Sequence, residues 1–312
     1  MGLIKNITAK ILKPEKNNLG LAVSLEELIS MRRFVNYINP KAAKKTSSLL
    51  AGDVKSAFKG RGLEFEEIRA YAFGDDVRDM DWRVTARRDE PYIKVFQEER
   101  DREIYVLLDF SATMVFGTKR ELKSVFAAKT AALIGWIALE NHDRFGCIIY
   151  DGEQNYVFKA KSGLKNLLSV FKMIAQISEK ILSEQKSGNF GKALKIAEKN
   201  IKSQSSVFIL SDFANFDANI KNALFALSQK SELYMLAVVD ILEITPPKSG
   251  EYMAEYAGNK LVFNTYSTDF VQNYEAYFAF KKRILQEFAV KTKSSFAELK
   301  NNLDISEQIK FF

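Results

Sequence analysis

Four residues that follow two apolar, strand-like segments have the chemistry to bind a divalent cation. The segments are residues 104–108 and 207–210. The four residues are Asp109, Ser111 and Thr113 after the first segment and Asp212 after the second. Ligands of open parallel sheets bind beyond the carboxyl ends of the strands, so these side chains are expected to share one site. Hard cations such as Mg²⁺ or Mn²⁺ prefer oxygen ligands. The alternative is that the aspartates and hydroxyls cap the following helices.

The sequence offers little for catalysis by other means. The chain has one histidine, His142, and one cysteine, Cys147, which excludes a site that needs two imidazoles and excludes a disulfide framework. It has no G-x-x-x-x-G-K-[ST] phosphate loop. No nucleophile–base pair is evident, and no catalytic residue is predicted. Because Mg²⁺ with aspartates also serves phosphoryl chemistry, a metal-dependent hydrolase using the same carboxylates is the alternative.

The elements that position these residues alternate between strand and helix along the chain. Short apolar strands separated by helices are typical of parallel sheets covered on both faces. We therefore predict an α/β domain with a doubly wound, mostly parallel sheet over residues 103–312. The expected strands are 104–108, 145–150, 207–210, 233–239 and 260–263, and the expected helices are 119–140, 164–177, 190–201, 218–228 and 269–287.

The positive charge of the chain lies near its start. Of the net charge of +7, all comes from residues 1–60, where 11 lysines and arginines face 4 acidic residues. This segment is predicted to be a basic tail, a helix opened by a capping box at Ser24 and Glu27, and a linker, over residues 1–58. A weak contact of the N-terminus with an anionic surface is a third functional alternative, and no specific nucleic-acid binding is expected. No signal peptide or transmembrane segment is evident, so a cytoplasmic location is predicted.

Residues 59–102 form a charged, β-rich extension with its own composition. Eight of the thirteen arginines lie in residues 61–103, and arginine suits bidentate pairing with carboxylates. We expect internal ion pairs, with Trp82 as a buried anchor. The competing interpretation is that Asp75, Asp76, Asp79 and Asp81 bind a cation or act as a catalytic pair. The residues with a structural or interaction role are predicted to be Arg61, Glu64, Arg69, Tyr71, Gly74, Asp75, Asp76, Arg78, Asp81, Trp82 and Arg87.

Two motifs resemble known families. The stretch Asp109-Phe110-Ser111-Ala112-Thr113 resembles the D-x-S-x-S signature of the von Willebrand factor type A domain, and residues 60–87 resemble the hallmark of the family called domain of unknown function 58. The resemblance implies a Rossmann-like type A fold and a metal-ion-dependent adhesion site for Mg²⁺ or Mn²⁺, completed by a partner's carboxylate. It also implies partnership with a MoxR-type AAA+ ATPase in the assembly or maturation of client complexes.

The resemblance fails at one position of the implied metal site. The threonine that is usually a direct ligand in type A domains falls on Gly188, and Ser187 is the neighbouring hydroxyl that would replace it. The predicted metal ligands are therefore Asp109, Ser111, Thr113, Asp212 and Ser187. On this basis we expect a non-enzymatic protein-interaction module.

Overall fold

The computed structural model describes residues 20–35, 63–88, 90–98, 102–256 and 259–308. The chain divides into two compact units, of which the smaller comprises residues 51–101 and the larger comprises the residues on either side of it. The described N-terminal helices therefore belong to the larger unit. The predictions of a basic tail before residue 20 and of a linker over residues 41–58 lie outside the described residues.

A six-stranded sheet runs through the larger unit. Five strands are parallel to their neighbours, and β5 at one edge is antiparallel to β4. In spatial order the strands are β10 (Ser295–Lys300), β7 (Glu232–Val239), β6 (Ser206–Ser211), β3 (Glu103–Asp109), β4 (Arg144–Tyr150) and β5 (Asn155–Lys161). This topology confirms the doubly wound, mostly parallel α/β fold that the sequence predicts.

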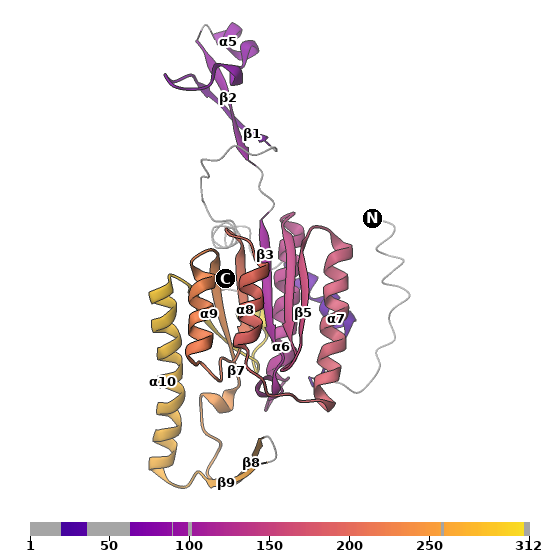
Figure 1. Ribbon diagram of the computed structural model, residues 1–312, viewed down its shortest axis with the longest axis vertical. Coiled ribbons are helices and arrows are strands. Elements are labelled where there is room, and N and C mark those ends of the chain that lie inside the picture. The colour runs from indigo at the N-terminus through magenta and orange to yellow at the C-terminus, as the bar shows by residue number, and fades with distance from the viewer. Residues whose placement is uncertain (1–19, 36–62, 89, 99–101, 257–258, 309–312) are drawn as a thin grey trace. The chain divides into compact units, whose positions relative to one another are not determined.

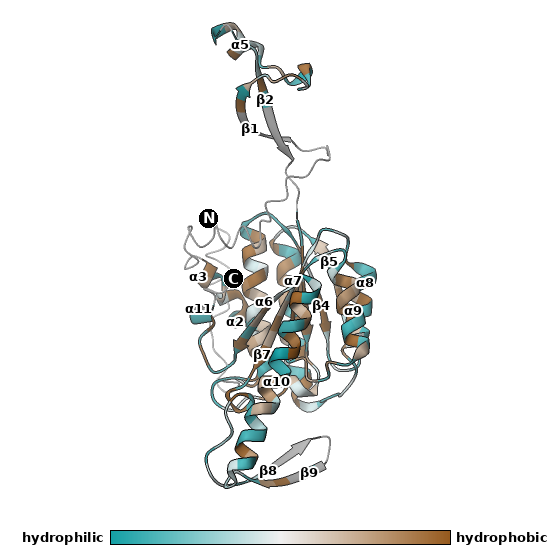
Figure 2. Cartoon of the chain, turned by 90° about the vertical axis from the view of Figure 1, so that its left-hand side faces the viewer, coloured by the Kyte–Doolittle hydropathy of each residue, from teal (hydrophilic) through white to brown (hydrophobic). Residues whose placement is uncertain are grey.

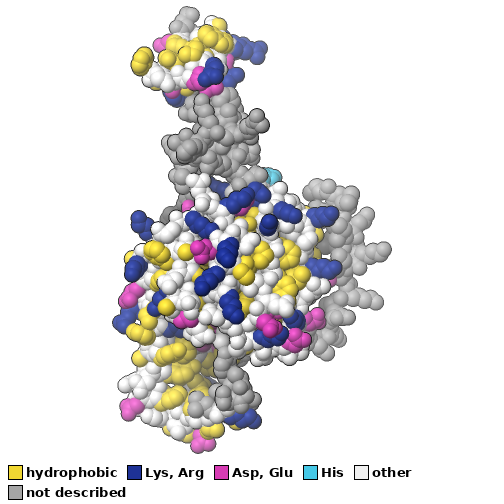
Figure 3. Space-filling model, in the orientation of Figure 1, with side chains coloured by type: hydrophobic (Ala, Val, Ile, Leu, Met, Phe, Trp, Pro, Cys, Tyr) yellow, Lys and Arg dark blue, Asp and Glu magenta, His cyan; other side chains and the backbone are white. Residues whose placement is uncertain are grey.

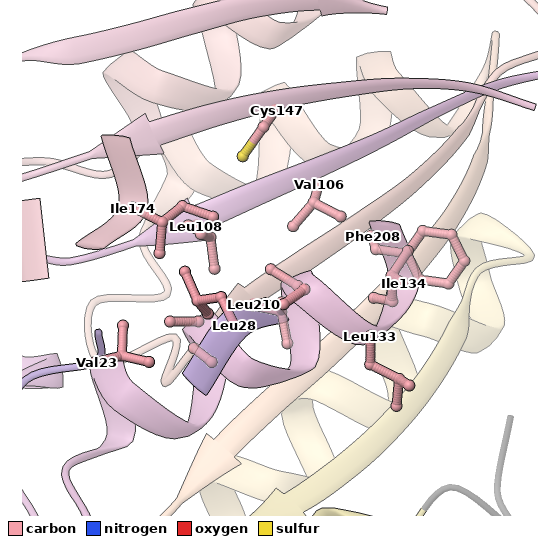
Figure 4. Packing of buried hydrophobic residues seen from close by; sticks show 14 of the residues in the cluster. Val23, Leu28, Val106, Leu108, Leu133, Ile134, Cys147, Ile174, Phe208 and Leu210 are labelled. Carbon is pink, nitrogen blue, oxygen red and sulfur yellow. The ribbon is translucent and has the colours of Figure 1, made fainter. Parts of the chain in front are cut away.

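Helices cover both faces of this sheet (Figure 1). The described helices of the larger unit are α2 (Leu25–Ser30), α3 (Arg32–Val35), α6 (Lys123–Glu140), α7 (Leu164–Ser183), α8 (Gly191–Asn200), α9 (Ala218–Ser228), α10 (Thr268–Thr292) and α11 (Ile305–Gln308). Along β3, Val106 and Leu108 pack in one buried cluster with α6 and α7, whereas Tyr105 and Leu107 pack in another with α8 and α9. Figure 4 shows the first cluster around Val106 and Leu108. Burial on both faces explains why the strands are continuous apolar runs.

The predicted capping box opens the N-terminal helix α2. The Ser24 hydroxyl accepts a hydrogen bond from Glu27 N at 3.2 Å, and Glu27 Oε2 accepts one from Ser24 N at 2.9 Å. Trp136 Nε1 of α6 donates to Leu28 O of α2 at 3.0 Å. Because α2, α7 and the sheet all pack against α6, that helix is buried on nearly every side.

Some boundaries differ from the predicted ones for identifiable reasons. Helix α6 begins at Lys123 rather than at residue 119, because Thr118 is held by Asp240 through its N and Oγ1 at 2.9 and 2.6 Å. The sequence pattern does not predict the edge strand β5, whose residues are mostly half-buried or exposed. It also omits β8 (Glu251–Tyr256), which forms an antiparallel hairpin with β9 (Asn259–Asn264).

The smaller unit is a two-stranded hairpin with helical segments between its strands. β1 (Leu63–Ala70) pairs antiparallel with β2 (Tyr92–Glu98). The 3₁₀-helix η1 (Val77–Asp79) and the helix α5 (Trp82–Arg88) lie between them in the chain. The unit is therefore rich in β-structure, as the sequence predicts.

The surface of the larger unit is mostly polar, with some exposed apolar side chains. Helices α8 and α9 alternate in hydropathy, while the strands are largely hydrophobic (Figure 2). Lys and Arg side chains spread over the face that carries α8 and α9 (Figure 3). On α10, Tyr277 and Phe280 stay 61% and 52% exposed. Within the described parts of the chain, no helix has both the length and the apolar character that crossing a membrane requires.

Candidate metal centre

Asp109 and Asp212 meet at the point where the strand order of the sheet reverses. From β3 the chain continues to β4 on one side, and it returns later to form β6 on the other side. Leu108 of β3 pairs with Leu210 of β6, so the two strands end together. Asp109 is the last residue of β3, and Asp212 directly follows β6. Such a switch point is where doubly wound sheets bind ligands.

Asp109 is buried and held by two serines. The residue is only 3% exposed. Its Oδ1 accepts a hydrogen bond from Ser111 N at 3.0 Å, and its Oδ2 accepts one from Ser211 Oγ at 2.6 Å. Burial, together with repulsion from Asp212, raises the pKa of Asp109 from 3.8 to about 6, against the hydrogen bonds from both serines. A buried carboxylate of this kind gains from a nearby cation, because the cation favours its ionised form.

The loop after β3 turns its hydroxyls toward Asp212. Phe110 and Met114 are fully buried and anchor the loop, which contains the short 3₁₀-helix η2 (Ala112–Met114). Ser111 Oγ and Thr113 Oγ1 lie 3.4 Å apart, and Thr113 Oγ1 donates to Asp212 Oδ1 at 3.3 Å. The two hydroxyls and the two carboxylates therefore face one another.

The loop that carries Ser187 and Gly188 closes the site on another side. Lys186 O accepts a hydrogen bond from Ala112 N at 3.1 Å, which joins this loop to the loop after β3. A Cβ atom at Gly188 would collide with Gly152 O and with Tyr150 Oη. A threonine therefore does not fit at position 188 in this conformation, and Ser187 is the hydroxyl residue that the loop brings to the site.

All five predicted metal ligands line one pocket of about 100 Å³. Its other lining residues are Ala112, Gly188, Phe190, Ser211, Phe213, Ala214, Asn215 and Ile220. The volume suffices for a cation with some of its waters, since one water occupies roughly 30 Å³ of the liquid. In the described part of the chain, no group of three or more His, Cys, Asp or Glu side chains has metal-binding geometry. A cation here would depend on the hydroxyl oxygens, and an all-oxygen set of this kind fits Mg²⁺ or Mn²⁺.

A buried lysine, which the sequence analysis does not single out, stands beside the pocket. Lys123, the first residue of α6, is 2% exposed, and its Nζ lies 2.7 Å from Asp212 Oδ2 and 3.0 Å from Glu243 Oε1. Glu243 ends the 3₁₀-helix η3 (Ile241–Glu243) and is fixed by the N–H of Asp240 at 2.9 Å. The available sequence signal was a lysine in the first turns of a largely apolar helix.

The charges around Asp212 set the protonation of the cluster. Burial alone favours the neutral form of Asp212, but Lys123 and then Lys281 of α10 outweigh it and lower its pKa. Burial also disfavours the ammonium of Lys123, yet the carboxylates of Asp212 and Glu243 outweigh this and raise its pKa. Lys281 has a lowered pKa because burial prevails over the same two carboxylates. Asp212 and Lys123 thus form a buried pair of ionised groups.

The predicted residues of the smaller unit pair largely with one another. The Arg69 guanidinium binds both oxygens of Asp75 at 2.9 and 2.8 Å. Arg78 pairs with Asp76 at 3.1 Å. Asp81 accepts from Val84 N at 3.2 Å. These are internal ion pairs and caps.

Other predictions for the smaller unit have mixed outcomes. Trp82, which the sequence predicts to be a buried anchor, is 67% exposed at the start of α5, so the smaller unit itself does not bury it. Gly74 has φ +107°, a conformation that favours glycine, and Tyr71 N donates to Pro91 O at 2.7 Å. Arg87 is exposed in the last turn of α5. Arg61 and the side chain of Glu64 lie outside the described residues.

The fold and the pocket together define a doubly wound α/β domain with its candidate ligand site at the topological switch point. The chain belongs to the family described as "Protein of unknown function DUF58", whose model matches residues 67–283. This match confirms the family that residues 60–87 resemble.

The chain is also similar to individual relatives and to solved structures. Uncharacterized proteins of Mycobacterium bovis and Mycobacterium tuberculosis are 27% identical over 219 residues, which cover 70% of this chain and 68% of theirs. An aerotolerance-related membrane protein from Bacteroides fragilis is 14% identical, over 67% of this chain and 95% of that one, with a TM-score of 0.44. The SpRpn10 VWA domain is 10% identical in sequence, and the match covers 67% of this chain and 94% of that domain, with a TM-score of 0.36.

Proposed function

We propose that this chain is a non-catalytic protein-interaction module that docks an acidic side chain of its partner through a divalent cation. The cation, Mg²⁺ or Mn²⁺, would be held by the five oxygen-bearing residues of the pocket and would supply a coordination position for the partner's carboxylate. Those residues are Asp109, Ser111, Thr113, Ser187 and Asp212.

The observation that carries this proposal is the convergence of the five residues on one pocket. They come from three loops that are far apart in the sequence, and Thr113 and Asp212 are 99 residues apart yet hydrogen-bonded. Simple helix capping does not account for this arrangement, because the Ser111 side chain makes no capping hydrogen bond to η2. Hydroxyls and carboxylates of separate loops that face one another are suited to holding a common ligand.

The charge of the cluster favours an anionic partner group. Asp109, Asp212 and Glu243 bring three carboxylates, and Lys123 and Lys281 bring two ammonium groups. With all five ionised, the cluster has one net negative charge. A bound dication would change this to one net positive charge, which a single carboxylate from a partner would neutralise. A buried net charge is unfavourable, so the loaded site would select an acidic residue.

The resemblance to the family suggests which partner to test first. It implies a MoxR-type AAA+ ATPase with which the module would cooperate in assembling or maturing client complexes. Immobilised full-length chain should retain the ATPase of the same organism in Mg²⁺, and retention should fall at least tenfold with chelator or with Asp109→Ala. Asp151→Ala, at the end of the neighbouring strand β4, is the matched control and should retain the ATPase. Equal retention by Asp109→Ala would overturn metal-bridged docking.

The same experiment can be paired with a test for the alternative function. A metal-dependent hydrolase using the same carboxylates should cleave a generic phosphoester such as p-nitrophenyl phosphate with Mn²⁺, and Asp109→Ala should abolish that activity. The interaction module should show no turnover that depends on Asp109.

A further inference from the structure

Asp212 is shared between the pocket and a fixed positive charge of the chain itself. Its Oδ1 accepts hydrogen bonds from Thr113 Oγ1 at 3.3 Å and from Ala214 N at 3.0 Å, on the side of the pocket. Its Oδ2 binds Lys123 Nζ at 2.7 Å. Both side chains are 2% exposed, so little water screens this pair.

The ammonium of Lys123 cannot move away from Asp212 without losing other favourable contacts. It is also bound to Glu243 Oε1 at 3.0 Å, and Glu243 is held in turn by the backbone of Asp240. Phe116 lies beside it, with the ring centroid 5.7 Å from Nζ. Lys123 therefore keeps its charge in place whether or not the pocket holds an ion.

We propose that Lys123 makes the binding of the cation and of the acidic partner depend on each other. This inference rests on the proposed function. A dication on the Oδ1 side of Asp212 would face the ammonium across one carboxylate, and like charges in a buried site repel strongly. A carboxylate from the partner supplies the missing negative charge. The cation alone therefore binds weakly, and by linkage the cation and the acidic group each raise the affinity of the other by the same factor.

A merely structural role for Lys123 makes a different prediction. If the ammonium only anchored α6 to the loops after β6 and β7, its removal would change the stability of the protein. It would leave the effect of a carboxylate on cation affinity unchanged. The size of that effect, in the presence and absence of the Lys123 charge, therefore separates the two roles.

The test is calorimetric titration of Mn²⁺ into the full chain in sodium acetate and in sodium chloride, each at about 0.1 M so that ionic screening is matched. Acetate is the probe for the partner's carboxylate. The variant is Lys123→Gln, which removes the charge and keeps a hydrogen-bond donor. The matched control is Lys129→Gln, six residues further along α6, where the ammonium binds Glu121 and Glu27 instead. Should Lys123→Gln fail to fold, Lys281→Gln removes the second, less enclosed ammonium and is expected to act in the same direction.

For the wild type and for Lys129→Gln, the affinity for Mn²⁺ should be about tenfold higher in acetate than in chloride, a difference of about 1.4 kcal/mol. For Lys123→Gln, the affinity in chloride should rise about tenfold and the effect of acetate should disappear. Binding by Lys123→Gln that is no tighter than wild type in chloride would overturn this inference and leave the cation site standing. If neither the wild type in acetate nor Lys123→Gln binds Mn²⁺, the proposed cation site itself is wrong.

Discussion

Replacing Asp109 by asparagine is expected to stabilise the metal-free protein at neutral pH, although the residue is buried in the core of the site. Burial and the charge of Asp212 raise the pKa of Asp109 from 3.8 to about 6. The folded state therefore resists ionisation of this group. Asparagine has nearly the same shape and has no charge to bury, so it removes the penalty.

The magnitude follows from the pKa shift. A shift of about 2 units corresponds to about 3 kcal/mol of unfolding free energy at pH 8 and to about half of that at pH 5. Asparagine has one acceptor oxygen for the two hydrogen bonds that Ser111 N and Ser211 Oγ donate at 3.0 and 2.6 Å, so it loses one of them, which subtracts roughly 1 kcal/mol. The net gain at pH 8 should be about 2 kcal/mol, or an increase of roughly 4–8 °C in the melting temperature.

The sign of the pH dependence is specific. Because the folded pKa is raised, the folded state binds more protons than the unfolded state between about pH 4 and pH 6. Asp109 therefore makes the wild type less stable as the pH rises through this window. Asp212 has a lowered pKa, so its contribution has the opposite sign and is lost as the pH falls.

Urea denaturation at pH 5 and pH 8 in the presence of chelator measures these effects. Asp109→Asn should exceed the wild type in unfolding free energy, and by more at pH 8 than at pH 5. Asp212→Asn, directly after the neighbouring strand β6, is the matched control and should be destabilised, because it leaves Lys123 without its closest partner. The reasoning is refuted if Asp109→Asn is less stable than the wild type at pH 8, or if the difference does not change with pH.

Three further predictions concern residues around the site and the core. Lys123→Met should lower the unfolding free energy by about 3–5 kcal/mol in urea denaturation, because it leaves the buried carboxylate of Asp212 and the partly buried one of Glu243 without this ammonium; a loss below about 1 kcal/mol would mean that the ion pair is not formed. Gly188→Thr should destabilise the protein by roughly 1–3 kcal/mol without strengthening Mn²⁺ binding, since its Cβ meets Gly152 O and Tyr150 Oη, whereas tighter Mn²⁺ binding would show that the loop can adapt to the usual threonine. Cys147 is fully buried and its pKa is raised by burial, so Ellman's reagent should react with it only as fast as the protein unfolds; fast labelling of the native protein would contradict the packing of β4.

The fold was predictable from sequence wherever an element is apolar on a simple period. The helix Ala218–Ser228 was predicted with the observed bounds, and the buried strands β3, β4, β6 and β7 were predicted within one or two residues. The edge strand β5 was not, because only one of its residues is fully buried and its pattern lacks an apolar run. The start of α6 depends on Thr118 and Asp240, which are 122 residues apart.

The sequence predicted the carboxylates that line the candidate site, but not the lysine that pairs with one of them. Asp109 and Asp212 follow apolar strands, and that position alone indicates a site at the strand ends. Nothing local marks Lys123 as the partner of Asp212, since the two carboxylates that it binds, those of Asp212 and Glu243, are 89 and 120 residues away in the chain. The smaller unit does not bury Trp82, although the size of a tryptophan side chain favours burial on average, because its place in α5 leaves it exposed there.

The measurement that tests the central claim most directly is the stoichiometry and affinity of Mn²⁺ binding to the full chain in acetate. It is compared among the wild type, Ser111→Ala and Thr113→Val. Both variants keep the charge of the cluster and remove one candidate ligand oxygen each. The account predicts one Mn²⁺ per chain for the wild type and at least about tenfold weaker binding for each variant, a loss of about 1.4 kcal/mol or more. Absence of binding by the wild type, or binding that both variants retain unchanged, would contradict it.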